Sequence, residues 1–213
     1  MKRTLDQWLQ YQLGTHPQAI AMGLERVREV ARRMHLLALP CLVIKVAGTN
    51  GKGSTVAFIE AIAKASGFKT GAFTSPHVLR YNERIRIDGR DASDEQLVAA
   101  FEAIELARAD IPLTYFEFGT LAALWIFAEA QLDMAILEVG LGGRLDAVNI
   151  LDADVSVITT VDIDHQAYLG DDREAIGLEK AGIMRPGKPC ILGEKDPPSS
   201  MLRHAYAQGV YCV

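Results

Sequence analysis

The sequence has few cysteines and no excess of basic residues, and each absence excludes a class of protein. Its three cysteines, Cys41, Cys190 and Cys212, are odd in number and far apart. This spacing argues against a disulfide framework and against a paired-cysteine metal site. The totals of 22 Lys+Arg and 27 Asp+Glu give a formal net charge of −5, so we do not expect a nucleic-acid-binding surface. Any bound polyanion must therefore be met by a local site.

Long apolar segments are absent as well. The most apolar stretch, residues 121–128, is much shorter than the ~18 residues that a membrane span needs. The N-terminus carries Lys2 and Arg3, but no apolar signal-peptide core follows them. We therefore expect a monomeric cytoplasmic protein in a reducing compartment, bound to neither membrane nor nucleic acid.

Apolar segments of strand length alternate with segments of helical periodicity. This alternation predicts an α/β fold, a mostly parallel sheet with helices on both faces. The expected strands are 42–47, 68–74, 84–89, 134–137, 155–159, 189–192 and 210–213. Helices are expected at 5–13, 24–34, about 52–66, 171–181 and 199–208, and two more begin at the capping boxes Ser93–Gln96 and Thr114–Glu117.

The end of the chain bears on its domain organisation. No linker or repeat interrupts the alternation, so a single domain is the simplest division. The expected strand at 210–213 has no following helix to cover it. We therefore expect residues 1–213 to be one domain that is incomplete at its C-terminal end.

The strongest functional pattern is a glycine-rich loop between an expected strand and an expected helix. It consists of Gly48, Thr49, Asn50, Gly51, Lys52, Gly53 and Ser54. Glycines let the backbone turn its N–H groups inward, the helix N-terminus attracts anions, and Lys52 can reach the outer phosphates of a nucleotide. The loop departs from the common phosphate-loop pattern, because Val46 replaces the first glycine and Gly53 follows the lysine. The alternative is an ordinary glycine-rich turn with a solvated lysine.

The loop resembles that of the folylpolyglutamate synthase/dihydrofolate synthase family, relatives of the muramyl ligases. Further segments recur in that family in the same order, namely 74–77, 81–85, 113–117, 138–146, 164–165 with 169–170, and 179–183. The resemblance implies a phosphate-loop fold like the Mur ligase central domain. It also implies an ATP-binding ligase domain in a chain about twice as long, with a C-terminal domain that helps to bind glutamate.

The resemblance also implies a set of metal ligands. Glu138 ends an apolar strand, so its carboxylate is expected at the sheet edge beside the phosphate loop, where Mg²⁺ is held. In the family Ser75, Glu138 and His165 share this metal. The alternatives are a Glu138 that caps a neighbouring helix and a structural Asp164–His165 pair. Imidazole is an unusual Mg²⁺ ligand, which makes the assignment of His165 a demanding one.

Lys180 lies in an expected helix and would ordinarily be a solvent-facing partner of a residue one turn away. The resemblance implies instead that its amine is carbamylated by CO₂ and helps to hold a second Mg²⁺. Such a reaction needs the neutral amine, which burial or a nearby metal favours by lowering the lysine pKa.

The resemblance places a pteridine-bearing substrate near Thr114, Phe116 and Asp146. An aromatic face and a carboxylate suit a flat heterocycle with amino donors. Helix capping by Thr114 and core packing by Phe116 are equally consistent with the residues alone. Arg80, Arg84 and Arg86 either bring positive charge to the substrate or form a solvated strand face, and for Arg86 we expect the solvated face.

These expectations combine into an ATP-dependent ligase. Lys52 is expected to hold ATP, with Lys180 and His165 at the catalytic centre. A carboxylate of dihydropteroate or folate would be activated as an acyl phosphate and joined to L-glutamate. The alternatives are a muramyl-type peptide ligase and a nucleotide-binding module without ligase activity. A Ser-His-Asp hydrolase is disfavoured, because no G-x-S-x-G elbow surrounds any serine.

Overall fold

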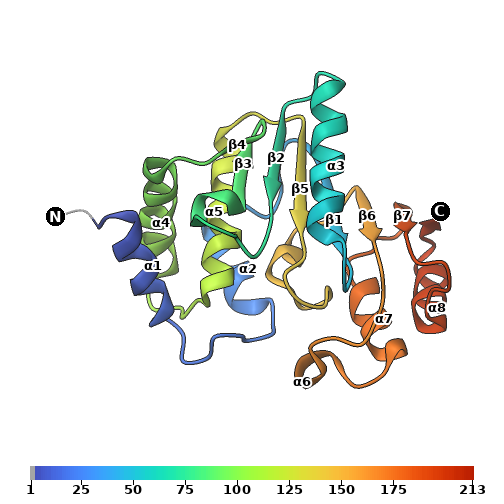
Figure 1. Cartoon of the computed structure of the whole chain (residues 1–213). Helices are drawn as coiled ribbons and strands as arrows, with labels where there is room; N and C mark the ends of the chain where they lie inside the picture. Colours follow the sequence, from blue (N-terminus) through green and yellow to red (C-terminus); the bar gives the residue numbers. More distant parts are fainter. Residues whose placement is uncertain (1–2) are drawn as a thin grey trace.

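The computed structural model describes residues 3–213, without the side chains at positions 166 and 167. Within these residues, one eight-stranded sheet has the order β4-β3-β2-β5-β1-β6-β7-β8 (Figure 1). The strands are β1 (Leu42–Ala47), β2 (Thr70–Phe73), β3 (Ile85–Ile87), β4 (Arg90–Asp91), β5 (Met134–Glu138), β6 (Val155–Ile158), β7 (Pro189–Leu192) and β8 (Tyr211–Cys212). In this order, each neighbouring pair of strands from β2 across to β8 is parallel. At the other edge, β3 pairs antiparallel with β2, and β4 pairs antiparallel with β3.

Helices cover both faces of this sheet, as predicted. They are α1 (Leu5–Leu13), α2 (Glu25–Arg33), α3 (Lys52–Ala65), α4 (Asp94–Arg108), α5 (Tyr115–Glu129), α6 (Gln166–Leu169), α7 (Arg173–Ala181) and α8 (Ser199–Gln208). Helix α3 packs against β1, β2 and β5 on one face, and α5 packs against β2 with α4 and α1 outside it (Figure 1). Two short 3₁₀ helices span Tyr81–Arg84 and Ala147–Ile150.

The element bounds follow the sequence patterns closely. The strands expected at 42–47 and 189–192 have those bounds, whereas β2 begins two residues later than expected and β8 has only two residues. The strand expected at 84–89 ends at Ile87, and an Asp-Gly turn with positive φ at both Asp88 and Gly89 joins β3 to β4. The short helix α6 was not predicted, because four residues are too few for a helical repeat to show.

Side-chain capping defines where α4 and α5 begin. The Ser93 hydroxyl accepts from the Gln96 N–H at 3.2 Å, and the Gln96 side chain accepts from the Ser93 N–H at 2.9 Å. Thr114 and Glu117 exchange the same pair of hydrogen bonds at 3.2 and 2.7 Å. Each box satisfies two backbone N–H groups that the helix leaves open. Both predicted capping boxes are therefore confirmed.

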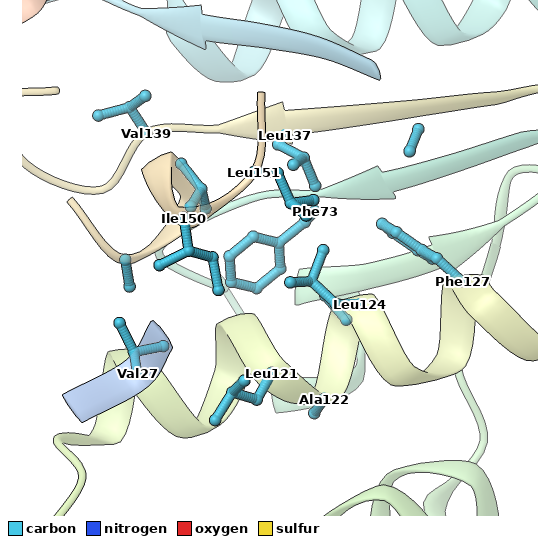
Figure 2. Close-up of a cluster of buried hydrophobic side chains, with 14 of the residues drawn as sticks. Val27, Phe73, Leu121, Ala122, Leu124, Phe127, Leu137, Val139, Ile150 and Leu151 are labelled. Carbon is cyan, nitrogen blue, oxygen red and sulfur yellow. The ribbon is translucent and has the colours of Figure 1, made fainter. Parts of the chain in front are cut away.

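The main hydrophobic core lies between the sheet and α5. Figure 2 shows the Phe73 ring at the end of β2 among Leu121 and Leu124 of α5, Leu137 of β5 and Ile150 of the following 3₁₀ helix. Burying a side chain of this size contributes about 1.5–3 kcal/mol. This packing holds the carboxyl ends of the central parallel strands together, and the loops that leave those ends form the site described next.

Candidate active site

The glycine-rich loop joins β1 to α3 and is braced by the segment after β6. Gly48 has a φ of 149°, and an added Cβ would lie 1.8 Å from the Thr159 hydroxyl oxygen, so only glycine fits. The Thr49 N–H donates to the carbonyl oxygen of Thr160 at 2.8 Å, and the Asn50 N–H donates to its hydroxyl at 3.0 Å. Gly51, with a φ of 81°, precedes α3 as its N-cap residue. The loop therefore has a defined shape at a helix N-terminus.

Lys52 reaches back over this loop. Its Nζ donates to the carbonyl oxygens of Gly48 at 2.8 Å and Thr49 at 3.2 Å. The lysine is therefore not freely solvated, which was the alternative for this pattern. Gly53 and Ser54 follow it in the first turn of α3, where backbone N–H groups have no partner within the helix and favour anions.

Glu138 lies beside the loop, at the end of β5. Its side chain is buried, and its two carboxylate oxygens would lie 3.8 and 3.9 Å from a Cβ added to Gly53. The Ser75 N–H donates to Glu138 Oε2 at 3.0 Å. Burial raises the pKa of the Glu138 carboxyl, and the Ser75 N–H and the charge of Lys52 oppose that rise. Glu138 therefore faces the loop and does not merely cap a neighbouring helix.

His165 follows β6 and lies against the neighbouring cavity. Its Nδ1 is 2.8 Å from Asp164 Oδ2, and both side chains are partly exposed. His165 lines the same cavity as Ser75. The structure thus brings two of the predicted ligands to one cavity wall, while the third, Glu138, contacts the backbone of Ser75.

Lys180 is buried on α7, near the charged groups of Lys52 and Asp164. Burial, together with the nearby charge of Lys52, lowers the pKa of the Lys180 amine to about 8, and Asp164 opposes this shift. The solvent-facing alternative is therefore wrong for Lys180, which is 3% exposed. A lysine in such surroundings has a reactive neutral form near physiological pH.

A cavity of about 310 Å³ opens beside these residues. It is mostly apolar, with the polar groups that a small-molecule site needs. Its walls come from the segment before α2, the segment between β2 and β3, the start of α5 and the segments that follow β5 and β6. The lining residues are Ala19, Ile20, Ala21, Met22, Gly23, Ser75, Pro76, Arg84, Thr114, Tyr115, Phe116, Glu117, Gly140, Leu141, Leu145, Asp146, Ala147 and His165.

All three residues predicted to meet the substrate line this cavity. Thr114 also caps α5, and the Phe116 ring also packs on Phe73 with centroids 5.7 Å apart. Both therefore combine the structural role with a place at the cavity. Phe116 lies so close to Gly140 that an added Cβ there would be 2.6 Å from the ring, which explains a glycine at that point.

Asp146 is one of two buried carboxylates that line the cavity, the other being Glu117. It accepts from the Leu141 N–H at 2.8 Å and from the Val148 N–H at 3.0 Å. Burial raises the pKa of the Asp146 carboxyl to about 6, and these backbone N–H groups oppose the rise. The carboxylate is therefore held rigidly and titrates not far below neutral pH.

The sequence left the roles of Arg80, Arg84 and Arg86 open, and in the structure they lie in three different environments. Arg84 lines the cavity, with its guanidinium 5.5 Å from the Tyr115 ring centroid. Arg86 is not on a solvated face, because it is 2.8 Å from the buried Glu60 and also donates to Thr74. The expectation for Arg86 is therefore wrong, since an acidic partner on α3 covers this strand. Arg80 remains largely exposed.

Some residues that line the cavity were not predicted from the sequence. Residues 19–23 line the cavity, although no pattern there pointed to a ligand. Arg26 forms an ion pair at 3.1 Å with the buried Glu117, whose other oxygen accepts from the Thr114 N–H. The Arg26–Glu117 pair joins residues 91 positions apart, so only the fold reveals it.

Two absences concern metals and membranes. Within residues 3–213, no three His, Cys, Asp or Glu side chains gather in a metal-binding group. The predicted ligand set has only two residues of these types, Glu138 and His165, so it stays a prediction. Among the described helices, none has both the length and the apolar character of a membrane span.

Comparison with known proteins places the chain in a family. The model of the Mur ligase middle domain matches residues 46–210. The chain belongs to the Mur ligase middle-domain family. This membership agrees with the glycine-rich loop and the mostly parallel sheet described above.

Its relatives within the Mur ligase family include folate enzymes. The dihydrofolate synthase/folylpolyglutamate synthase of Escherichia coli (strain K12) is 53% identical over 205 residues, 96% of this chain and 49% of the relative. That of Haemophilus influenzae is 50% identical over 201 residues, 94% and 46% of the two chains. The chain thus spans about half the length of the curated relatives it matches.

Solved structures of similar proteins match the fold of this chain. The structure described as E. coli FolC in complex with DHPP and ADP matches with a TM-score of 0.97 and 52% identity, covering 99% of this chain and 51% of that one. A bifunctional folylpolyglutamate synthase/dihydrofolate synthase with Mn, AMPPNP and L-glutamate bound matches with a TM-score of 0.93 and 50% identity, over 99% and 51%.

Proposed function

We propose that this chain is the ATP-binding domain of a ligase that joins a carboxylate of dihydropteroate or folate to L-glutamate. One observation carries the proposal. The phosphate loop, the buried Glu138 and the cavity containing Asp146 meet at one sheet edge, where a nucleotide and an acid substrate can lie side by side. The names of the relatives and the ligands in their structures support the same assignment.

The nucleotide is assigned to the loop of residues 48–54. The first turn of α3 points its free N–H groups at this loop, which suits the phosphates of ATP. The Lys52 ammonium now lies on two loop carbonyl oxygens. In the complex we expect it to turn to the outer phosphate oxygens, which carry more negative charge than a carbonyl.

The residues around Glu138 fit a divalent cation. Burial disfavours the charged form of the Glu138 carboxyl, and the nearby charge of Lys52 offsets this only in part. We assign Ser75, Glu138 and His165 as ligands of one Mg²⁺, and a carbamylated Lys180 as a ligand of a second. Bound there, Mg²⁺ would neutralise charge on the outer phosphates of ATP.

The acid substrate is assigned to the cavity beside the loop. Asp146 would accept hydrogen bonds from the amino groups of a pteridine, Phe116 would contact its ring, and Thr114 would lie at the same wall. Arg84, on the cavity lining, is placed to pair with the substrate's carboxylate.

The reaction follows from this placement. A substrate carboxylate oxygen attacks the γ-phosphorus of ATP, ADP leaves, and an acyl phosphate forms. The amine of glutamate then attacks the acyl carbon, loses a proton and displaces phosphate, which leaves an amide. The protein contributes alignment and positive charge, because a free carboxylate is a poor acyl donor.

The remaining parts of the enzyme are assigned from the length of its relatives. We propose that residues 1–213 bind ATP and the acid substrate, and that glutamate binding needs further sequence of the kind the longer relatives contain. The three cysteines are free thiols, which suits the cytoplasmic location that we propose.

Binding to this chain tests the assignment directly. Calorimetry with ADP plus Mg²⁺ and with dihydropteroate should detect both ligands. Lys52→Ala should abolish nucleotide binding while Lys64→Ala, an exposed lysine on the same helix, leaves it unchanged. Normal nucleotide affinity in both Lys52→Ala and Glu138→Ala would refute the proposed site.

A second assay separates the two ligase classes. In a protein of the relatives' full length, dihydropteroate should stimulate ATP hydrolysis and a UDP-muramyl substrate should not. The reverse result would identify a muramyl-type ligase. Tight ATP binding without stimulated hydrolysis in that protein would identify a nucleotide-binding module instead.

A further inference from the structure

The lysine in the middle of β1 has contacts that the proposed function does not use. Lys45 is completely buried within an otherwise apolar strand. Its Nζ donates to Asn149 Oδ1 at 2.8 Å and to the carbonyl oxygen of Leu151. Neither acceptor is a carboxylate, and burying an amine is unfavourable unless it is hydrogen-bonded or paired with an opposite charge. The two hydrogen bonds therefore offset a burial cost that an apolar residue at this position would avoid.

Asn149 connects Lys45 to two other parts of the chain. Its Oδ1 accepts from Lys45 and from Arg185, the latter at 2.9 Å. Its Nδ2 donates to the carbonyl oxygens of Arg144 and Gly182, both at 3.0 Å. The amide thus uses two donors and two acceptors, its full capacity. It clamps the loop after β5 onto the end of α7, and Lys45 ties this clamp to the central strand.

Both clamped segments carry residues of the proposed site. The Asn149 N–H donates to the carbonyl oxygen of Asp146 at 2.8 Å, and Lys180 lies two residues before Gly182. The segments touch directly as well, because a Cβ added to Gly143 would lie 2.7 Å from the carbonyl oxygen of Glu179. A shift of Asn149 would therefore move the cavity wall that holds Asp146.

The Lys45 side chain lies on the face of the sheet opposite α3, the helix that follows the glycine-rich loop. Ile44 and Val46 pack in the cluster next to α3, whereas Val43 and Ala47 belong to the core on the other face. Side chains alternate along a strand, so Lys45 shares the face of Val43 and Ala47. Its removal should disturb the cavity more than the phosphate loop.

We propose that Lys45 is a positioning residue for the acid substrate. Through Asn149 it holds the wall with Asp146 and the last turn of α7 in register with the strand that leads into the phosphate loop. This inference rests on the proposed function, because it assumes that the acid substrate occupies the cavity.

The test compares two lysine substitutions in this chain. Lys45→Met keeps the length of the side chain and removes its donors, while Lys188→Met is a matched change at an exposed lysine paired with Asp154. We expect Lys45→Met to weaken dihydropteroate binding about tenfold and to change the affinity for ADP with Mg²⁺ less than about twofold. Lys188→Met should change neither.

Asn149→Asp tests the clamp independently, and carries the test if Lys45→Met does not fold. It replaces the Nδ2 donor with an acceptor that faces two carbonyl oxygens, so dihydropteroate binding should weaken to a similar degree. The double variant should lose less than the product of the two single effects, because both act through one contact.

Three results would overturn the inference. Folded variants with normal dihydropteroate affinity would leave Lys45 a purely structural residue, and equal weakening of both ligands would mean a general loss of structure. A wild-type chain that binds ADP but not dihydropteroate would overturn the proposed substrate and the inference together. In the first two results the wild-type chain still binds dihydropteroate, so they overturn the inference and leave the proposed substrate in place.

Discussion

At the residue scale, the site depends on charged groups that the fold removes from water. Glu138, Asp146 and Lys180 are each less than 5% exposed. Burial shifts the pKa of both carboxyls upward and that of the amine downward. Groups shifted toward neutral pH are typical of functional sites, and the sequence alone shows none of these shifts.

The titration of Asp146 predicts a pH dependence of substrate binding. With a pKa of about 6, the carboxyl is ionised at pH 7 and largely protonated at pH 5, so it loses acceptor capacity as the pH falls. Dihydropteroate affinity, measured by calorimetry, should fall about tenfold between these values. Asp146→Asn should bind more weakly with a flat profile. A wild-type profile as flat as that of the variant would contradict the assignment.

The buried amine of Lys180 predicts a reaction with CO₂. At a pKa of about 8, its neutral fraction grows about fiftyfold from pH 6 to pH 8. Addition of CO₂ to this amine, with loss of a proton, forms the carbamate. Isotopically labelled bicarbonate should give a carbamate resonance that rises with pH and is missing in Lys180→Ala. Persistence of that resonance in the variant would assign it elsewhere.

At the scale of elements, capping boxes and glycines decide how the strands lead into the site. The N-cap of α5 is Thr114, a cavity residue, so the start of this helix and the wall of the cavity are one structure. Gly48 and Gly51 shape the loop before α3, because each has a positive φ. Two parts of the site, the glycine-rich loop and the cavity wall at Thr114, thus lie at helix N-termini.

The two capping boxes predict a separable effect on stability and binding. Ser93→Ala and Thr114→Ala each remove a cap and should lower the free energy of unfolding by about 1 kcal/mol, measured in urea. Only Thr114→Ala should also weaken dihydropteroate binding, because Ser93 is exposed and outside the cavity lining. Weaker binding in Ser93→Ala would show that loss of stability alone explains the effect.

At the scale of the whole molecule, one core connects the strand ends to α5. Phe73 is completely buried, and residues from β5, α5 and the loop after β5 surround it (Figure 2). The same packing keeps Phe116 against the cavity. The core therefore sets the position of the glycine-rich loop relative to the cavity wall.

This packing predicts a large effect of Phe73→Ala. Removing the ring leaves a cavity in a close-packed core, so the free energy of unfolding should fall by about 3–5 kcal/mol in urea titrations. Phe68→Ala removes the same ring at a half-exposed position and should change stability by less than about 1 kcal/mol. Similar losses in both variants would mean that Phe73 is less tightly packed than described.

The sequence by itself determined the features that depend on near neighbours. Strand and helix periodicity, the capping boxes and the glycine-rich loop between β1 and α3 all follow from contacts within a few residues. Such signals do not depend on how the rest of the chain folds. Most element bounds and the position of the glycine-rich loop were therefore predictable, and the resemblance of motifs pointed to the family.

Only the tertiary structure decided which distant residues meet. It placed Arg86 against Glu60 rather than in solvent, buried Lys180, and set Lys45 against Asn149. The hydrogen-bonded pairs Arg86–Glu60 and Lys45–Asn149 join residues 26 and 104 positions apart in the sequence. Burial and long-range pairing depend on the packing of the whole sheet and its helices, which no local pattern encodes.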